Sequence, residues 1–324
     1  MTGDILQVEQ VTNYYSDNGL GIVSKREKRK VLDNVSFTVH RNEFFGLVGE
    51  SGCGKSTLGK AILGLIPFEG QIKVDGISYS RKNRKQFAKN IQAVFQDPLS
   101  ALDPKKTIGF TLEEPLKVHH IGTKAERMKK VNEILELIGL DASYIKRYPK
   151  ELSGGQRQRV CIGAALMVNP KLIIADEAVS ALDVSVGSQI LNLLRDIHEK
   201  RELSLLFISH NLNVVYYLCD RIAVMYRGQI VEMGKADEIY NRPLHPYTKL
   251  LLSSIPDIEK NLFDNKKDRK LPETERDDIP DGCRFYHRCP FAIDKCRGAQ
   301  ELSNMADAKK EEHLVRCHLA GQIK

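Results

Sequence analysis

A short run rich in glycine, with one lysine and several hydroxyl side chains, offers a place for phosphate groups. Residues 49–57 read GESGCGKST and fill the pattern G-x-x-x-x-G-K-[ST]. Apolar residues 44–48 precede the run, which predicts a strand, then a loop, then a helix. Glycines let successive backbone N–H groups turn inward around an anion, and the positive end of the helix adds to the field. The run therefore predicts a nucleotide site, and a glycine-rich turn without a ligand is the less favoured alternative.

The residue types within this phosphate loop predict separate tasks. Lys55 supplies a point charge for the outer phosphates. Ser56 is expected to place its hydroxyl on Mg²⁺, and Thr57 can donate to an inner phosphate. The predicted ATP contacts in the loop are Gly49, Glu50, Ser51, Gly52, Cys53, Gly54, Lys55, Ser56 and Thr57.

Two carboxylates follow another apolar run further along the chain. Residues 172–175 read LIIA, which predicts a buried strand, and Asp176 and Glu177 come next. Beside a phosphate loop, Asp176 is interpreted as the Mg²⁺ partner and Glu177 as the group that orients or deprotonates an attacking water. Helix capping is the alternative for such a pair, and the phosphate loop favours the catalytic interpretation.

A second glycine pair also precedes a predicted helix. Residues 152–156 read LSGGQ, so backbone N–H groups and the Ser153 hydroxyl again suit an anion. Taken alone, this pattern more often marks an ordinary helix cap.

The elements that position these groups alternate along the chain. Strands are predicted at 5–11, 35–39, 91–95, 172–175, 205–209, 223–226 and 229–232, and helices at 125–139, from 156, at 186–197 and from 211. Alternation of strands and helices indicates an α/β fold with parallel strands. Arg227 and Gly228 predict a hairpin, and hence an antiparallel part. Residues 16–30 are expected to form an exposed insertion.

The composition sets limits on location and partners. The chain has 324 residues, 42% of them hydrophobic, and no apolar stretch near the roughly 18 residues of a membrane helix. No signal peptide is visible, so the chain is expected in the cytosol, where its seven cysteines favour metal binding or packing over disulfides. The net charge of +7 is concentrated in residues 25–30 and 81–85, expected to be loops. Solvated charge is favoured there over attraction to anionic lipid or nucleic acid.

Taken together, these motifs resemble the ordered motif set of ATP-binding cassette (ABC) ATPases. The resemblance rests on residues 49–57, Gln96, 152–156, 176–177, 180–183 and His210. It covers roughly residues 5–256 and implies a P-loop NTPase of the ABC type, with a parallel core sheet, an antiparallel β subdomain and a helical subdomain at about 97–157. We therefore predict an ATPase domain at 1–257, a charged linker at 258–282 and a cysteine-bearing tail at 283–324.

The resemblance assigns roles residue by residue. It implies that Tyr15 stacks on adenine, that Glu177 is the catalytic base and that His210 senses the γ-phosphate. Gln96 is implied to contact both Mg²⁺ and the attacking water, so the implied Mg²⁺ set is Ser56, Gln96 and Asp176. The alternatives are ordinary strand packing for Tyr15 and a polar strand end for His210.

The same resemblance implies a head-to-tail dimer. In such a dimer, the second predicted anion site would complete the ATP site of the partner subunit. Its residues are Ser153, Gly154, Gly155 and Gln156. Asp183 would contact the opposite subunit. The family usually has proline after the catalytic glutamate, whereas Ala178 stands here and leaves the φ angle of that turn less fixed.

Subfamily marks narrow the function. Residues 95–98, 100–104 and 242–248 resemble ATPase subunits of oligopeptide and dipeptide importers, although nickel and opine importers share them. The insertion after Tyr15 resembles the F-type subunit more than the D-type. The chain would then energise peptide import at the cytoplasmic face of the membrane. The implied partners are a homologous ATPase subunit in a heterodimer, two transmembrane permease subunits and an extracytoplasmic solute-binding protein. A soluble cassette acting on DNA or ribosomes is disfavoured because the chain has one cassette and no heptad run, so no nucleic acid is expected.

Four cysteines near the carboxyl terminus form a second candidate site. Cys283, Cys289, Cys296 and Cys317 are separated by five, six and twenty residues, a spacing that matches neither common zinc modules nor ferredoxins. The resemblance implies a [4Fe–4S] cluster on these thiolates. Zinc, with His287, His313 or His318 replacing one thiolate, and plain packing without metal remain open, as does a tail that serves chiefly as a metal-dependent docking module.

Overall fold

The computed structural model describes residues 3–16, 28–254, 282–305 and 312–323. Their contacts divide the chain into two units that are each built from distant segments. Unit 1 comprises Met1–Glu9, Phe37–Phe44 and Gly59–Ile208, and unit 2 comprises Gln10–Ser36, Phe45–Leu58 and Ser209–Lys324. Most of the predicted insertion and nearly all of the predicted linker lie outside the described residues.

Unit 1 contains the predicted parallel strands. Strands β6 (Ile91–Val94), β7 (Leu172–Asp176) and β8 (Ser204–Ser209) are neighbours, with Val94 opposite Ala175 and Asp176 opposite Ile208. Every residue of β7 and β8 is buried, which is why both read as continuous apolar runs. Helix α7 (Val184–Arg201) connects these two strands along the chain, as the alternating pattern predicts.

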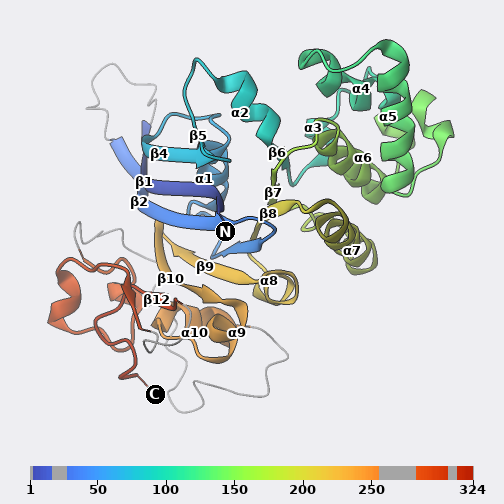
Figure 1. The fold of residues 1–324 in the computed structure, drawn as a ribbon. Helices are drawn as coiled ribbons and strands as arrows, with labels where there is room; N and C mark the ends of the chain where they lie inside the picture. The colour runs from blue at the N-terminus through green and yellow to red at the C-terminus, as the bar shows by residue number, and fades with distance from the viewer. Residues whose placement is uncertain (1–2, 17–27, 255–281, 306–311, 324) are drawn as a thin grey trace, which may run out of the picture. The chain divides into compact units, whose positions relative to one another are not determined.

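A group of helices lies between β6 and β7 in sequence. They are α3 (Pro98–Ala101), α4 (Ile108–Val118), α5 (Lys124–Leu137), η1 (Ala142–Lys146), η2 (Pro149–Glu151) and α6 (Gly154–Leu166). Figure 1 shows α4, α5 and α6 packed together. Gly163 of α6 permits this close approach, because an added Cβ would lie 3.0 Å from side-chain atoms of both Ile134 and Ile138. Helix α6 packs against α4 and α5. It begins at Gly154, two residues earlier than predicted.

A four-stranded sheet has the order β2-β1-β4-β5. Its strands are β1 (Asp4–Ser16), β2 (Lys28–His40), β4 (Glu69–Val74) and β5 (Ile77–Ser78). Strands β1 and β2 are both longer than predicted, and they extend into the stretch that had been interpreted as an insertion. The expectation of a loop at 81–85 is wrong in part, because Arg84 and Lys85 begin helix α2 (Arg84–Asn90). The buried ring of Phe87 holds that helix against its neighbours.

Strand β3 (Phe44–Val48) belongs to unit 2 from Phe45 onward and leads into the phosphate loop. It pairs in parallel with β9 (Arg221–Tyr226), and β10 (Gln229–Lys235) pairs antiparallel with β9. The predicted hairpin is confirmed: Arg227 has φ 42° and Gly228 φ 82°, the two positive angles that a tight type I′ turn requires. Beyond β10 come β12 (Leu314–Val315) and β11 (Ser303–Asn304), both from the cysteine tail.

The remaining elements of unit 2 are short. They are α1 (Lys55–Ile62, continuing into unit 1), α8 (Leu212–Leu218), α9 (Ala236–Asn241), α10 (Pro246–Ser253), η3 (Tyr286–Arg288) and η4 (Asp294–Arg297). The cysteine tail therefore adds strands to the sheet that carries the phosphate loop. No helix in the described part of the chain is both long and apolar enough to span a membrane.

Candidate functional site

The phosphate loop has the backbone that only glycine adopts readily. Gly52 and Gly54 have φ angles of 77° and 110°. At Gly49, an added Cβ would lie 2.2 Å from the carbonyl oxygen of Met225 in β9. Side chains at these positions would strain the turn or collide with β9, so the glycines of the sequence motif are explained by geometry. The loop leads directly into α1, as the sequence predicts.

Lys55 is folded back across this loop. Its side chain is buried, and Nζ donates to the carbonyl oxygens of Gly49 at 2.7 Å and Glu50 at 2.9 Å. The nearest partners of this buried ammonium are neutral carbonyls, with the Cys53 sulfur at 3.8 Å. It is a ready partner for an anion, because an ionised acceptor makes the stronger hydrogen bond. Cys53 packs beneath it, and burial raises the pKa of the Cys53 thiol, which keeps it neutral. These features fit a bound triphosphate.

Other parts of unit 2 support the loop from outside. The Gly228 N–H donates to the Cys53 carbonyl at 2.7 Å, and the Glu50 N–H donates to the Tyr247 hydroxyl oxygen at 2.8 Å. Arg288 binds both carboxylate oxygens of Glu50, at 2.8 and 2.9 Å. Sequence reasoning missed Tyr247 and Arg288 as site residues. Tyr247 lies within the marked run 242–248, whereas nothing in the sequence around Arg288 indicated a role at the loop.

Two further predicted contacts belong to unit 2. The Tyr15 side chain is 66% exposed near the end of β1, so its ring is available for stacking. His210 directly follows β8 and borders a cavity of about 290 Å³ that is also lined by Val48 and Leu251. Because Val48 immediately precedes Gly49, this places His210 near the start of the phosphate loop.

Unit 1 brings together the predicted carboxylates and Gln96. Gln96 lies two residues after β6, and Asp176 ends the neighbouring β7, so both lie at the carboxyl edge of the same parallel strands. Asp176 is buried, and Glu177 has a left-handed φ of 49°. The Glu177 backbone N–H donates to the Ile208 carbonyl oxygen at 2.9 Å, and the Ser180 hydroxyl donates to the Glu177 backbone carbonyl oxygen at 2.9 Å. These hydrogen bonds hold the Glu177 backbone on both sides and so fix the point from which its side chain extends.

The second glycine pair begins α6 with a closed capping box. Gln156 N–H donates to the Ser153 hydroxyl at 3.3 Å, and Ser153 N–H donates to the Gln156 side-chain oxygen at 3.0 Å. Gly155 is required by packing, since an added Cβ would lie 2.3 Å from the Val186 side chain of α7. Ser153 is exposed, so this helix start faces outward.

Comparison with known proteins gives these motifs a family. Residues 32–180 match the family model "ABC transporter", and residues 231–296 match "Oligopeptide/dipeptide transporter, C-terminal region". The chain is 43% identical to the oligopeptide transport ATP-binding protein AppF of Bacillus subtilis (strain 168), over 97% of each chain. This chain belongs to the ABC transporter ATPases. It is also 44% identical to OppF of the same organism, over 83% of this chain and 89% of the relative.

Solved structures of other ABC transporter ATPases share the fold. The cbiO1 protein of Clostridium perfringens, part of the ABC transporter complex cbiONQ, matches with a TM-score of 0.65 and 28% identity. The match covers 74% of this chain and 91% of cbiO1. The cassette MJ0796, solved as a post-hydrolysis dimer bound to ADP and Pi, has a TM-score of 0.62 and 29% identity. That match covers 71% of this chain and 98% of MJ0796. The predicted ABC-type P-loop fold is thereby confirmed.

In this ABC transporter ATPase, Asp183 caps its own helix. Its carboxylate accepts from the Val186 N–H at 2.8 Å at the start of α7. The neighbouring Val184 side chain is 88% exposed. The predicted contact of Asp183 with an opposite subunit stays a prediction.

The four tail cysteines lie within electrostatic reach of one another. Burial raises the pKa of Cys283 to about 12, and the charges of the other three thiols add to the rise. His318, next to Cys317, has a buried Nε2 without a hydrogen-bond partner. Among the described residues, however, no group of three or more His, Cys, Asp or Glu side chains is placed to hold a metal ion. The soft donor set fits a thiolate-bound group, and the identity of that group stays a prediction.

Proposed function

We propose that this chain is the ATP-hydrolysing subunit that energises an oligopeptide importer. The observation that carries the proposal is the near full-length match to AppF, which is described as an oligopeptide transport ATP-binding protein. The match to the oligopeptide/dipeptide transporter region, at residues 231–296, reaches into the cysteine tail. ATPase activity follows from the family, and the peptide cargo is the proposal.

The residues that perform hydrolysis are proposed from their types and positions. Lys55 and the backbone N–H groups of residues 49–57 bind the phosphates, and Tyr15 stacks on adenine. Glu177 orients the attacking water and accepts its proton as the new P–O bond forms and the bond from the γ-phosphorus to the bridging oxygen breaks, leaving ADP and phosphate. Mg²⁺, when bound, supplies charge stabilisation, with Ser56, Gln96 and Asp176 as its proposed partners. His210 contacts the γ-phosphate.

The subunit is proposed to work as a dimer at the cytoplasmic face of the membrane. MJ0796 is dimeric, which supports a second cassette facing this one. The exposed start of α6, at Ser153, then completes the nucleotide site of the partner subunit. A homologous ATPase subunit, two permease subunits and a solute-binding protein complete the proposed assembly.

The tail cysteines are proposed to hold a [4Fe–4S] cluster rather than zinc. A cluster distributes its four thiolates over separate iron atoms, whereas one zinc ion draws all its ligands to about 2.3 Å from a single point. Anaerobically purified protein should show broad visible absorption that is lost in a Cys289→Ser variant. A colourless sample that contains zinc would reject the cluster.

The cargo is tested in the assembled transporter. Subunits that bind this chain in detergent are copurified, reconstituted in vesicles and given a solute-binding protein with a defined pentapeptide, with nickel, or with an opine. We expect ATP hydrolysis to rise only with the peptide. Stimulation by nickel or an opine alone would assign the chain to the related importers, and stimulation by nucleic acid without permease subunits would reject the transport function.

A further inference from the structure

The cysteine tail reaches the phosphate loop through one ion pair. Arg288, which immediately precedes Cys289, binds the Glu50 carboxylate with two parallel hydrogen bonds of 2.8 and 2.9 Å. The two residues are 238 positions apart in the chain. The side chains are 23% and 40% exposed, so water screens the pair only in part. A two-point contact fixes the direction of the carboxylate as well as its position.

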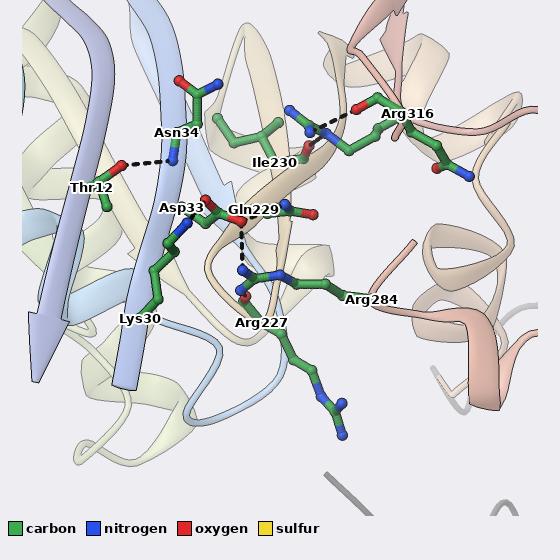
Figure 2. Close-up of polar contacts among 10 residues, drawn as sticks. Thr12, Lys30, Asp33, Asn34, Arg227, Gln229, Ile230, Arg284 and Arg316 are labelled. Atoms are coloured by element: carbon green, nitrogen blue, oxygen red, sulfur yellow. Dashed lines mark hydrogen bonds and ion pairs between the residues drawn. The ribbon is translucent and has the colours of Figure 1, made fainter. Parts of the chain in front are cut away.

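A second tail arginine holds the other support of the loop. Arg284, which follows Cys283, donates to the Asp33 carboxylate of β2 at 2.5 Å and also to the carbonyl oxygen of Arg227 (Figure 2). Burial by itself would raise the pKa of the Asp33 carboxyl. Lys30 and Arg284 outweigh burial, so the pKa is lowered and the carboxylate stays charged. Arg227 precedes Gly228, whose N–H holds the Cys53 carbonyl of the phosphate loop. Arg284 thus fixes the hairpin turn that supports the loop.

Packed rings connect these two arginines. Phe285 lies between them in sequence and is fully buried, with its ring 5.3 Å from that of Tyr226 and 5.5 Å from that of Tyr247. Tyr247 carries the hydroxyl that accepts the Glu50 N–H. Burial raises the pKa of Tyr247 far above its usual range, so its hydroxyl stays neutral. The tail, the rings and the loop therefore form one continuous packed group within unit 2.

We propose that the cysteine tail positions the phosphate loop for ATP, with Arg288 as the positioning residue and Glu50 as its partner. Arg288 orients the loop through Glu50, and it neutralises a carboxylate that stands within the loop and would otherwise repel the triphosphate. This inference rests on ATP binding at the phosphate loop. It adds a role at the phosphate loop for a segment that the sequence predicts as a metal site, a docking module or a packed tail.

The test is a double-substitution cycle in the full-length chain. ATP affinity is measured by equilibrium binding for the parent and for Arg288→Gln, Glu50→Gln and the double variant. Arg288→Gln should weaken ATP binding about fivefold, because it leaves the Glu50 charge unpaired. Glu50→Gln also loses the two-point contact but removes the repelling charge, so it should weaken ATP binding less than Arg288→Gln does. The double variant should match Glu50→Gln rather than Arg288→Gln. In the assembled transporter, Arg288→Gln should raise KM for ATP and leave kcat near the parent value.

A second readout follows the loop itself. Amide hydrogen exchange in residues 49–57 should become faster in Arg288→Gln. In Tyr247→Phe, which removes only the accepting hydroxyl, exchange should become faster at the Glu50 amide. Arg297→Gln is the matched control, because Arg297 also follows a tail cysteine but donates to the Tyr286 hydroxyl rather than to Glu50. It should change neither affinity nor exchange.

Three outcomes would overturn the inference. They are parent-like affinity and exchange in Arg288→Gln, equal weakening by Arg297→Gln, and a double variant as weak as Arg288→Gln. A parent chain that fails to bind ATP would instead reject the proposed function. Thermal unfolding of every variant separates a positioning effect from loss of the fold, and Tyr247→Phe gives a second way to loosen the loop if Arg288→Gln is unstable.

Discussion

Two helices of this ABC transporter ATPase begin with glycines and suit an anion, but they are built differently. The loop before α1 has Gly52 and Gly54 at positive φ and a buried Lys55 bound to the loop's own carbonyl oxygens. The start of α6 has no positive φ, and Ser153 and Gln156 cap each other. The first is a loop whose backbone and lysine are already arranged to bind an anion. The second is an exposed helix end whose first turn is already satisfied by its own side chains.

The difference indicates how the two sites divide their work. We expect the loop before α1 to bind most of the phosphate charge, because its glycines have positive φ and its cation is buried. We expect the start of α6 to contribute less binding energy, since a ligand must compete with the capping box. This is the arrangement expected when one subunit holds the nucleotide and the opposite subunit closes over it. The following predictions test that division, beginning with the largest effect.

Glu177→Gln should abolish most ATP hydrolysis and leave ATP binding at the phosphate loop intact. Turnover in the assembled transporter should fall about 10²–10⁴-fold, because the amide cannot accept a proton. ATP affinity should stay within about twofold of the parent, since the change removes only a charge. Single-turnover hydrolysis and equilibrium binding measure the two effects. Glu202→Gln is the control, because Glu202 has the same left-handed φ of 49° at the end of α7. Unchanged turnover in Glu177→Gln would show that Glu177 is not the catalytic base.

Lys55→Ala should break the first helix start. Loss of the buried ammonium should weaken ATP binding about 10- to 100-fold, in proportion to a charge-assisted hydrogen bond. Isothermal titration of the isolated chain with ATP and Mg²⁺ gives the affinity. Lys60→Ala, at an exposed position on the same helix, should leave affinity unchanged. Equal affinity in the parent and Lys55→Ala would contradict the phosphate-loop assignment.

Ser153→Ala should affect only the second helix start. The isolated chain should bind ATP with parent affinity, while hydrolysis in the assembled transporter should fall about fivefold, since one hydroxyl contact is lost. Ser153→Thr keeps the hydroxyl and should retain most of the activity, which separates ligand contact from loss of a helix cap. Weakened binding in the isolated chain would show that Ser153 serves its own nucleotide site.

His245→Asn should affect neither helix start but should change stability at low pH. Burial lowers the pKa of His245 to about 4 from 6.5, although Glu232 opposes and Arg316 assists that shift. Between pH 6.5 and 4 the unfolded chain binds a proton that the folded chain does not, so stability falls as pH falls. The contribution of this one site is at most about 3 kcal/mol. Asparagine keeps an acceptor for the Tyr247 N–H and should flatten the pH dependence of the unfolding temperature in this window; an equally steep curve would contradict the assignment.

Much of the fold and of the ATP motifs could be predicted because those signals are local. The parallel strands β7 and β8 are continuous apolar runs, and the hairpin at Arg227 and Gly228 has its turn residues side by side. Element ends were less predictable: β1 and β2 extend beyond the predicted strands, since pairing with neighbours overrides weak local preference. The metal ligands of the tail stay a prediction, because the cysteine spacing is diagnostic of neither zinc modules nor ferredoxins.

The sequence by itself determined the phosphate loop, since a nest of N–H groups needs only neighbouring glycines and a lysine at fixed spacing. It also determined the capped start of α6, because Ser153 and Gln156 lie within one turn. Only the tertiary structure decided what holds the loop in place. Glu50 forms an ion pair with Arg288, 238 positions away, and its N–H donates to the Tyr247 hydroxyl. No local sequence pattern encodes these contacts. They exist because β9, β10 and β12 bring the tail onto the sheet that carries the phosphate loop.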